Sequence, residues 1–258
     1  MSSLTARFSK CFTCLIFLAG LWIAGCSNPD NQTVTLSVAS SLAVPVQEIV
    51  DSFSEKNPEI QVLVNTGSSG ALARQILHGA KVDIFLSAND RWIQKLEEAG
   101  LASSRPEMAF LGNELAVIVP DESPSESLDA LVGGKGKVAV GDFGAVPAGE
   151  YTKAWLESAG LYSQLADRLV FFKNEQQVLR AVESRHAAAG VVYLSSLNLS
   201  NKVQLLYQPP LESYPVIRYR FAEILQSEKN PFVPTMLEFL RNAEAKKIWR
   251  AYGFQVVE

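Results

Sequence analysis

Two serine-rich turns have the residue types in this chain that are best suited to chemistry. The first is Ala39-Ser40-Ser41-Leu42 and the second is Thr66-Gly67-Ser68-Ser69-Gly70. Each combines serine hydroxyls with the backbone N–H groups of small residues, which are the donors that a small oxyanion needs. Serine is also among the best N-caps, so either turn alone is explained as well by the start of a helix. Together, at equivalent places, they favour an oxyanion site that contains Ser41 and Ser69.

A third turn, Val146-Pro147-Ala148-Gly149, extends this set of donors. Proline suits the first turn of a helix, and the small residues after it leave their N–H groups accessible. None of the three turns contains Lys or Arg. A site of neutral donors binds an anion through many hydrogen bonds and helix dipoles, so we expect selectivity to depend on the size and geometry of the ligand.

Strands and helices alternate along the chain and position these turns. Apolar residues alternate over 34–38 and again over 60–64, and they recur at helical spacing between the two. This βαβ opening continues to about Val119, and a second series begins near Lys137 after a stretch rich in Pro and Ser. The pattern predicts an α/β protein of two units, each a mostly parallel sheet flanked by helices. Ligands of such sheets bind beyond the carboxyl ends of the strands, where the three turns lie.

Residues 1–25 have the features of a signal peptide rather than of a folded element. Arg7 and Lys10 precede an apolar run over 11–24 that is too short to span a membrane comfortably. The run leads into Ile23-Ala24-Gly25-Cys26, which resembles the lipobox of bacterial lipoproteins. The resemblance implies cleavage before Cys26 and a lipid anchor on its thiol. An uncleaved anchor, or an ordinary signal peptide with an incidental cysteine, is the alternative.

Composition sets the class of protein and argues against some partners. Of the 258 residues, 48% are hydrophobic and 19% are charged, as is typical of a folded globular protein. The net charge of −4 provides no broad basic field, so no nucleic acid partner is expected. Cys11 and Cys14 form a C-x-x-C pair inside the predicted signal, so no metal or redox role is expected of them. Residues 26–32, rich in Asn, Ser, Asp and Pro, are expected to form a flexible tether.

A family resemblance becomes specific when the turns are taken with their neighbours. The motifs that carry it are Ala39-Ser40-Ser41-Leu42, Gly67-Ser68-Ser69-Gly70-Ala71-Leu72-Ala73-Arg74-Gln75-Ile76, Val82-Asp83-Ile84-Phe85-Leu86-Ser87-Ala88, Gly112-Asn113, Val138-Ala139-Val140-Gly141-Asp142, Val146-Pro147-Ala148-Gly149, Gly190-Val191-Val192-Tyr193, Tyr214-Pro215-Val216 and Tyr252-Gly253-Phe254. Their order and spacing resemble the periplasmic molybdate-binding proteins of ABC importers, over essentially the whole chain after the signal. The resemblance implies a two-lobed periplasmic-binding-protein fold of type II with a two-strand hinge. It implies a first lobe over 33–113 and 218–258 and a second lobe over 114–217.

The resemblance also implies which residues hold the ligand. In that family two serine hydroxyls with their amides, an alanine amide, a further backbone amide and a tyrosine hydroxyl bind a tetrahedral oxyanion. Matched motif by motif, these positions are Ser41, Ser69, Ala148, Glu175 and Tyr193. The family often has valine at the position of Glu175, and a carboxylate beside a bound dianion is repulsive unless it points away.

The function that the resemblance implies is that of a lipid-anchored solute-binding protein at the periplasmic or extracytoplasmic face of the bacterial envelope. It would capture molybdate, and tungstate of similar size, by closing its lobes around the anion. It would deliver the anion to the permease and ATPase of an ABC importer. No cofactor and no catalysis are expected, and a monomer is the default state.

Other functions stay open at this point. The same scaffold could bind another small oxyanion such as sulfate, which a competition experiment would reveal. A serine hydrolase would use Ser41 or Ser69 as its nucleophile, but neither turn has the G-x-S-x-G pattern and no His or Lys is recognisably placed as a base. A partner-binding module of the envelope would not need two matched hydroxyl turns.

Overall fold

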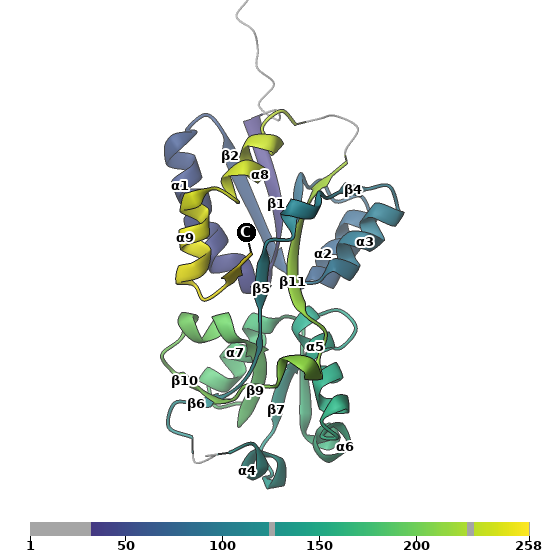
Figure 1. Cartoon of the computed structure of the whole chain (residues 1–258), viewed down its shortest axis with the longest axis vertical. Coiled ribbons are helices and arrows are strands. Elements are labelled where there is room, and N and C mark those ends of the chain that lie inside the picture. The colour runs from purple at the N-terminus through teal and green to yellow at the C-terminus, as the bar shows by residue number, and fades with distance from the viewer. Residues whose placement is uncertain (1–31, 124–126, 226–229, 258) are drawn as a thin grey trace, which may run out of the picture.

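A computed structural model of the chain describes residues 32–123, 127–225 and 230–257. The predicted signal over 1–25, Cys26 and most of the predicted tether lie outside the described residues. Within the described ranges the chain forms two lobes, one above the other in Figure 1, and each is built on its own sheet. No helix in these ranges has the length and apolar character that crossing a bilayer requires.

The first lobe contains a seven-stranded sheet. In spatial order its strands are β12 (Gln255–Val256), β5 (Leu111–Asn113), β11 (Ile217–Ile224), β3 (Ile84–Ser87), β1 (Thr33–Ala39) and β2 (Gln61–Gly67), with β4 (Ala102–Ser103) beside β11. Strand β1 lies between β2 and β3 and pairs in parallel with both. The opening βαβ pattern of the sequence therefore folds as expected.

Helices cover both faces of this sheet, with α1 and α9 on one side and α2 and α3 on the other in Figure 1. The helices of the lobe are α1 (Ala43–Lys56), α2 (Ser69–Leu77), α3 (Asp90–Glu98), α8 (Val233–Phe239) and α9 (Ala243–Ala251). The apolar residues of α1 recur at helical spacing and are buried, because they face the sheet. Phe53 of α1 meets Phe239 of α8 edge to face, with ring centroids 5.2 Å apart.

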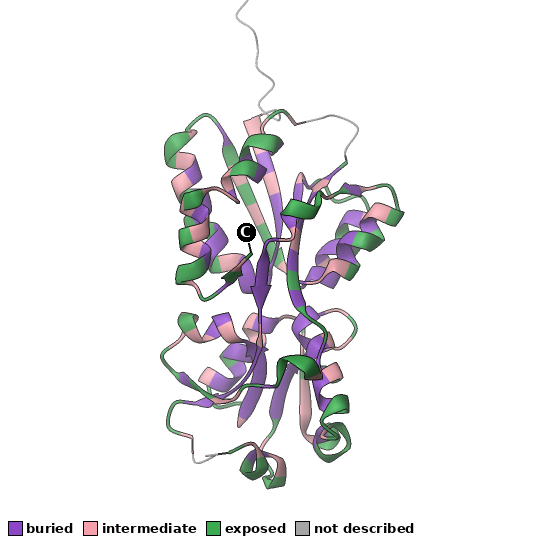
Figure 2. Cartoon of the chain, viewed as in Figure 1, coloured by how far each residue is buried: buried purple, intermediate pink, exposed green. Residues whose placement is uncertain are grey.

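The second lobe contains a five-stranded sheet. Its strands are, in spatial order, β10 (Val203–Tyr207), β6 (Leu115–Pro120), β9 (Ala189–Tyr193), β7 (Val138–Gly141) and β8 (Leu169–Phe172). The helices around it are α4 (Leu128–Gly133), α5 (Pro147–Ser158), α6 (Tyr162–Leu165) and α7 (Glu175–Glu183). Figure 2 shows its central strands as buried, and every residue of β6, β7 and β9 is buried.

Both sheets are mixed, with parallel strands on one side and antiparallel strands on the other. The α/β fold with two sheets flanked by helices is confirmed, but the expectation of mostly parallel sheets holds only for β1–β3 and β7–β9. The reason is that the chain passes between the lobes. Strand β6 enters the second lobe from the first and β11 returns, so each runs antiparallel to its neighbours β9 and β3.

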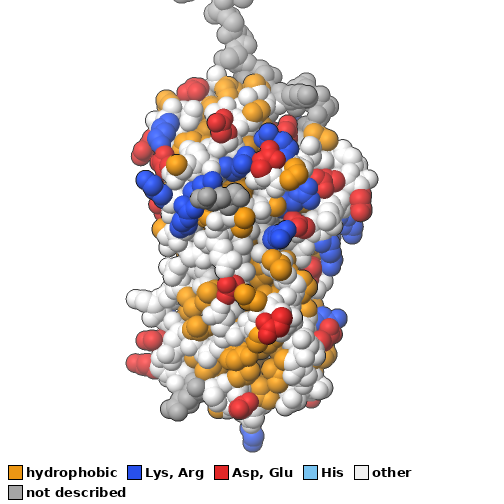
Figure 3. Space-filling view, viewed as in Figure 1, with side chains coloured by type: hydrophobic (Ala, Val, Ile, Leu, Met, Phe, Trp, Pro, Cys, Tyr) orange, Lys and Arg blue, Asp and Glu red, His pale blue; other side chains and the backbone are white. Residues whose placement is uncertain are grey.

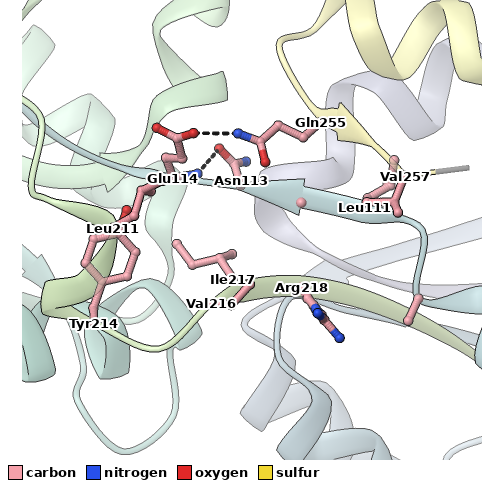
Figure 4. A pocket seen from close by; sticks show the side chains of 12 residues that line it. Leu111, Asn113, Glu114, Leu211, Tyr214, Val216, Ile217, Arg218, Gln255 and Val257 are labelled. Carbon is pink, nitrogen blue, oxygen red and sulfur yellow. Dashed lines mark hydrogen bonds between the residues drawn. The ribbon is translucent and has the colours of Figure 1, made fainter.

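Two neighbouring crossings join the lobes. The chain leaves the first lobe from β5 through Glu114 into β6, and it returns at the start of β11, where Ile217 pairs with Asn113. A groove of about 350 Å³ lies along this hinge (Figure 4). Within it Gln255 Nε2 donates to the Glu114 carboxylate, and the Glu114 N–H donates to Asn113 Oδ1. The C-terminal strand β12 is thereby tied to the crossing.

Candidate functional site

A small cavity lies between the lobes, where α1, α2, α5 and α7 begin. The structure brings together at this cavity all of the ligand-binding residues predicted from the sequence: Ser41, Ser69, Ala148, Glu175 and Tyr193. The rest of its lining is Ala39, Ser40, Ser68 and Ala88 from the first lobe and Val146 and Pro147 from the second. Its volume is about 10 Å³, on a scale on which one water molecule needs roughly 10–15 Å³. The cavity has room for about one water molecule, so a tetrahedral oxyanion would be enclosed only if the lobes adjust around it.

Ser41 contributes a hydroxyl from the first lobe. It lies in the 3-10 turn Ser40–Leu42, and α1 begins only after Leu42, so Ser41 is not the N-cap that the sequence suggested. Ser41 Oγ lies 3.1 Å from the hydroxyl of Tyr219, which accepts from Asn113 Nδ2 at 3.3 Å. Tyr219 can therefore donate its proton to Ser41, and the Ser41 O–H stays available for a ligand.

Ser69 contributes the second hydroxyl, and its neighbour Ser68 has a different role. Ser68 is the N-cap of α2, and its Oγ accepts from Ala71 N at 3.4 Å. Ser69 is fully buried, and its Oγ accepts from Ala88 N at 3.1 Å. Because this contact uses a lone pair and not the proton, the Ser69 O–H can also donate to an anion.

The second lobe contributes backbone N–H groups from two helix N-termini. Ala148 follows Pro147 in the first turn of α5, and Glu175 is the first residue of α7, whose N-cap Asn174 accepts from Gln177 N at 2.9 Å. N–H groups in a first turn have no partner within their helix, and the helix dipole favours an anion there. Gly149 allows α5 to start so close to β7, since a Cβ atom at this position would lie 2.3 Å from Gly141 O.

Tyr193 ends β9 with its side chain inside the cavity wall. It is 1% exposed, and no hydrogen-bond partner for its hydroxyl lies among the described residues. Burial raises the pKa of this hydroxyl well above its ordinary value, so it remains a protonated donor. A buried hydroxyl without a partner is costly, and an anion in the cavity would supply the missing acceptor.

Glu175 corrects the expectation of a site that consists of donors alone. Glu175 lines the cavity, and the residue is 2% exposed. Oε1 accepts from Ser196 Oγ and, at 3.4 Å, from Tyr193 N, whereas Oε2 has no partner among the described residues. Burial raises the pKa of the Glu175 carboxyl to about 6, against the lowering effect of the two bonds to Oε1.

A polar cluster outside the cavity lining lies between the lobes. Glu150 of α5 lies 3.3 Å from Arg91 of α3 and accepts from Asn89 Nδ2 at 3.1 Å, so this cluster connects the two lobes. Gly70 N donates to Ala145 O at 3.1 Å and adds a backbone contact between them. On the face shown in Figure 3, Lys and Arg side chains are more numerous over the first lobe than over the second.

Sequence reasoning missed the residues that orient the predicted ones. Tyr219 bonds Ser41, Ala88 bonds Ser69, and Ser196 bonds Glu175. A signal existed for Ser196, because Ser195-Ser196 is a further serine pair after a strand. Tyr219 gave no such signal, since it lies within β11 and reaches Ser41 only through the tertiary fold.

Comparisons with known proteins identify the family of this chain. The model of the family described as bacterial extracellular solute-binding protein matches residues 34–255. The proposed substrate-binding lipoprotein YvgL of an ABC transporter in Bacillus subtilis is 32% identical, over 93% of this chain and 96% of its own. The molybdate-binding protein ModA of Haemophilus influenzae is 31% identical, over 96% of this chain and 98% of its own.

Solved structures share the fold at lower identity. The periplasmic molybdate-binding protein of Azotobacter vinelandii superposes with a TM-score of 0.76 at 20% identity, over 87% of this chain and all of that one. The sulfate-binding protein SubI of Mycobacterium tuberculosis superposes with a TM-score of 0.74 at 14% identity, over 88% of each chain. On the extent of the family match and the identity to full-length relatives, this chain belongs to the bacterial extracellular solute-binding protein family, whose relatives include substrate-binding proteins of ABC transporters.

Proposed function

We propose that this chain captures molybdate, and tungstate, between its lobes and delivers it to the permease and ATPase of an ABC importer. The observation that carries the proposal is the cavity in which two serine hydroxyls, a tyrosine hydroxyl and the N-termini of α5 and α7 converge, with no Lys, Arg or His among the described residues that line it. Such donors bind a small oxyanion reversibly. Two relatives named molybdate-binding protein ModA, at 31% and 30% identity, support this ligand.

The proposal includes a lipid anchor on Cys26 at the extracytoplasmic face of the envelope. It is supported by the lipobox-like Ile23-Ala24-Gly25-Cys26 and by the name lipoprotein given to the Bacillus subtilis relative. The proposal does not include catalysis. Ser41 and Ser69 bond Tyr219 and Ala88, and no histidine or lysine lines the described cavity to act as a base.

Sulfate is the second candidate ligand, because it is also a tetrahedral dianion and the fold is shared with a sulfate-binding protein. The cavity distinguishes the two by size, since the same donors meet the oxygens of molybdate or of sulfate at different distances from the centre. A site made of donors alone would reject a protonated phosphate. This site would reject it less strongly, because Glu175 can accept a hydrogen bond from a protonated anion.

The test is isothermal titration of the chain from residue 27 onward with molybdate, tungstate, sulfate and phosphate at one pH and ionic strength. We expect molybdate and tungstate to bind tightly and sulfate to bind weakly. Ser69→Ala should weaken molybdate binding by about 1.5 to 3 kcal/mol, the scale of a hydrogen bond to a charged group. Ser127→Ala, at the N-cap of the distant α4, is the matched control and should bind as the parent does. Sulfate as the tightest ligand, or unchanged binding by Ser69→Ala, would contradict the proposal.

A further inference from the structure

Glu175 places an incompletely bonded carboxyl group in the wall of a site that the proposed function assigns to an anion. Oε1 is held on the protein side by Ser196 Oγ and by Tyr193 N, and both of these are donors. Oε2 is buried and has no partner among the described residues, and the residue lines the cavity. Oε2 is therefore the carboxyl oxygen that can meet a ligand.

The described elements with the most extensive packing against α7 place no cation beside Glu175. Among the described elements that pack against α7, the strands β6, β7 and β8 and the turn Ser40–Leu42 carry no ionisable side chain. Strand β9 contributes Tyr193, and the other titratable groups that interact with these buried residues are Tyr219, Tyr151 and Glu150. Arg91 is paired with Glu150. The groups that act on the Glu175 carboxyl itself are the Ser196 hydroxyl and the Tyr193 N–H, and neither is charged.

A dianion beside an ionised Glu175 would place three negative charges in one small buried space without a counter-ion, which a medium of low dielectric penalises heavily. A protonated carboxyl removes this repulsion and adds a donor, because its O–H can point from Oε2 to an oxygen of the ligand. The proton comes from solvent, and no other bond forms or breaks.

We infer that the site takes up one proton together with its dianion, held between Glu175 Oε2 and a ligand oxygen. This inference rests on the proposed function and makes Glu175 a specificity-determining residue of the same site. The count of protons does not depend on which of the two oxygens holds the hydrogen. The bound complex contains one proton more than the ionised carboxyl and the dianion do when they are separate.

The sign of the pH dependence follows from this linkage. Burial raises the pKa of Glu175 to about 6, and a dianion beside it raises the pKa of the complex further. Affinity is therefore full below about pH 6 and is lost as the pH rises above it, roughly tenfold per pH unit until the pKa of the complex is reached. A carboxylate that bound the ligand in its charged form would give the opposite slope.

The experiment is titration with sodium molybdate, at micromolar concentration, of the parent chain and of Glu175→Gln from about pH 5.5 to 8. We expect the parent to lose affinity as the pH rises and to take up close to one proton per anion near pH 7.5, measured from the binding enthalpy in buffers of different ionisation enthalpy. Glu175→Gln keeps an acceptor for Ser196 and gains a permanent donor, so it should bind equally at both ends of the range and exceed the parent at pH 8 by roughly tenfold or more.

Glu183→Gln, at the other end of α7, is the matched control and should keep the pH dependence of the parent. A parent affinity that is flat or that rises with pH, with no proton uptake, would overturn the inference while leaving the proposed function standing. A slope that persists in Glu175→Gln would assign the proton to Glu150 or another group and would also overturn it. If Glu175→Gln does not fold, as judged by thermal unfolding, the proton count of the parent decides. Absence of binding by any of the four oxyanions at pH 5.5 would remove both this inference and the proposed function.

Discussion

At the scale of single residues, two buried tyrosines near the cavity have hydroxyl groups in opposite situations. The rings of Tyr193 and Tyr219 lie 5.8 Å apart, and both residues are almost fully buried. The Tyr219 hydroxyl bonds Ser41 and Asn113, whereas the Tyr193 hydroxyl has no partner among the described residues. The first hydroxyl therefore contributes to the stability of the folded chain, and the second would be available to a ligand.

Removal of each hydroxyl should have a different effect. Tyr193→Phe should leave the free energy of unfolding of the ligand-free chain unchanged or slightly higher, and it should weaken molybdate binding by about 1.5 to 3 kcal/mol, roughly 10- to 150-fold. Tyr219→Phe should instead lower the free energy of unfolding by about 1 kcal/mol. Denaturant unfolding without ligand and calorimetric titration measure the two quantities. A Tyr193→Phe protein that is clearly less stable and binds normally would show that the hydroxyl is structural.

The site residues differ in how far their sequence neighbourhood could reveal them. Ser41, Ser69 and Ala148 lie in turns whose composition alone indicates helix N-termini with exposed donors, so they could be predicted. The orientation of Glu175 could not, because it depends on Ser196, which is 21 residues away and meets it only after β9 and α7 have packed. For this reason the sequence suggested a site of donors alone, and the structure adds an acid.

At the scale of elements, the starts of α3 and α5 form a contact between the lobes. Arg91 and Asn89 reach Glu150 from the first lobe, and Glu150 is itself mostly buried. Burial raises the pKa of the Glu150 carboxyl, and the Arg91 guanidinium acts against this rise. The contact between the lobes thus places a poorly solvated carboxylate beside its counter-ion.

Arg91→Ala should therefore weaken molybdate binding by about 0.5 to 1 kcal/mol, or roughly 2- to 5-fold, because Glu150 would enter the closed contact without a cation. The deficit should be present at high pH and should shrink as the pH falls and Glu150 is protonated. Lys95→Ala is the control, since Lys95 lies on the same helix and also stacks over Trp92 but does not reach Glu150. Equal effects of the two substitutions on calorimetric affinity would argue that the helix, and not the contact between lobes, is responsible.

At the scale of elements, the sequence predicts the parallel strands but not the direction of the strands that cross between the lobes. The alternation of apolar residues predicts the parallel set β1–β3 and the helices that follow, because these are local patterns. The direction of β6 and β11 depends on the path of the chain between the lobes, and this leaves no local periodicity. Strand β6 is apolar throughout and β11 alternates apolar with charged residues, and neither pattern determines the direction of a strand.

At the scale of the whole molecule, the ligand would stabilise both lobes together, because its donors come from both. Molybdate at about one hundred times its Kd should stabilise the folded chain by about 2.7 kcal/mol. For a chain of this size that corresponds to a rise in Tm of roughly 5 to 10 °C. Calorimetry should show one transition that moves as a whole with molybdate and moves much less with sulfate. A transition that splits, with only one part shifted, would mean that the anion binds to a single lobe.

The placement of the donors also determines how long a captured anion stays. Ser41 and Ser69 belong to one lobe and Ala148, Glu175 and Tyr193 to the other, so an open molecule offers only half of the contacts from either side. No cation in the described lining holds the anion by itself. Residence time is then the lifetime of the closed form, and a membrane partner that separates the lobes would release the cargo without having to compete for it chemically.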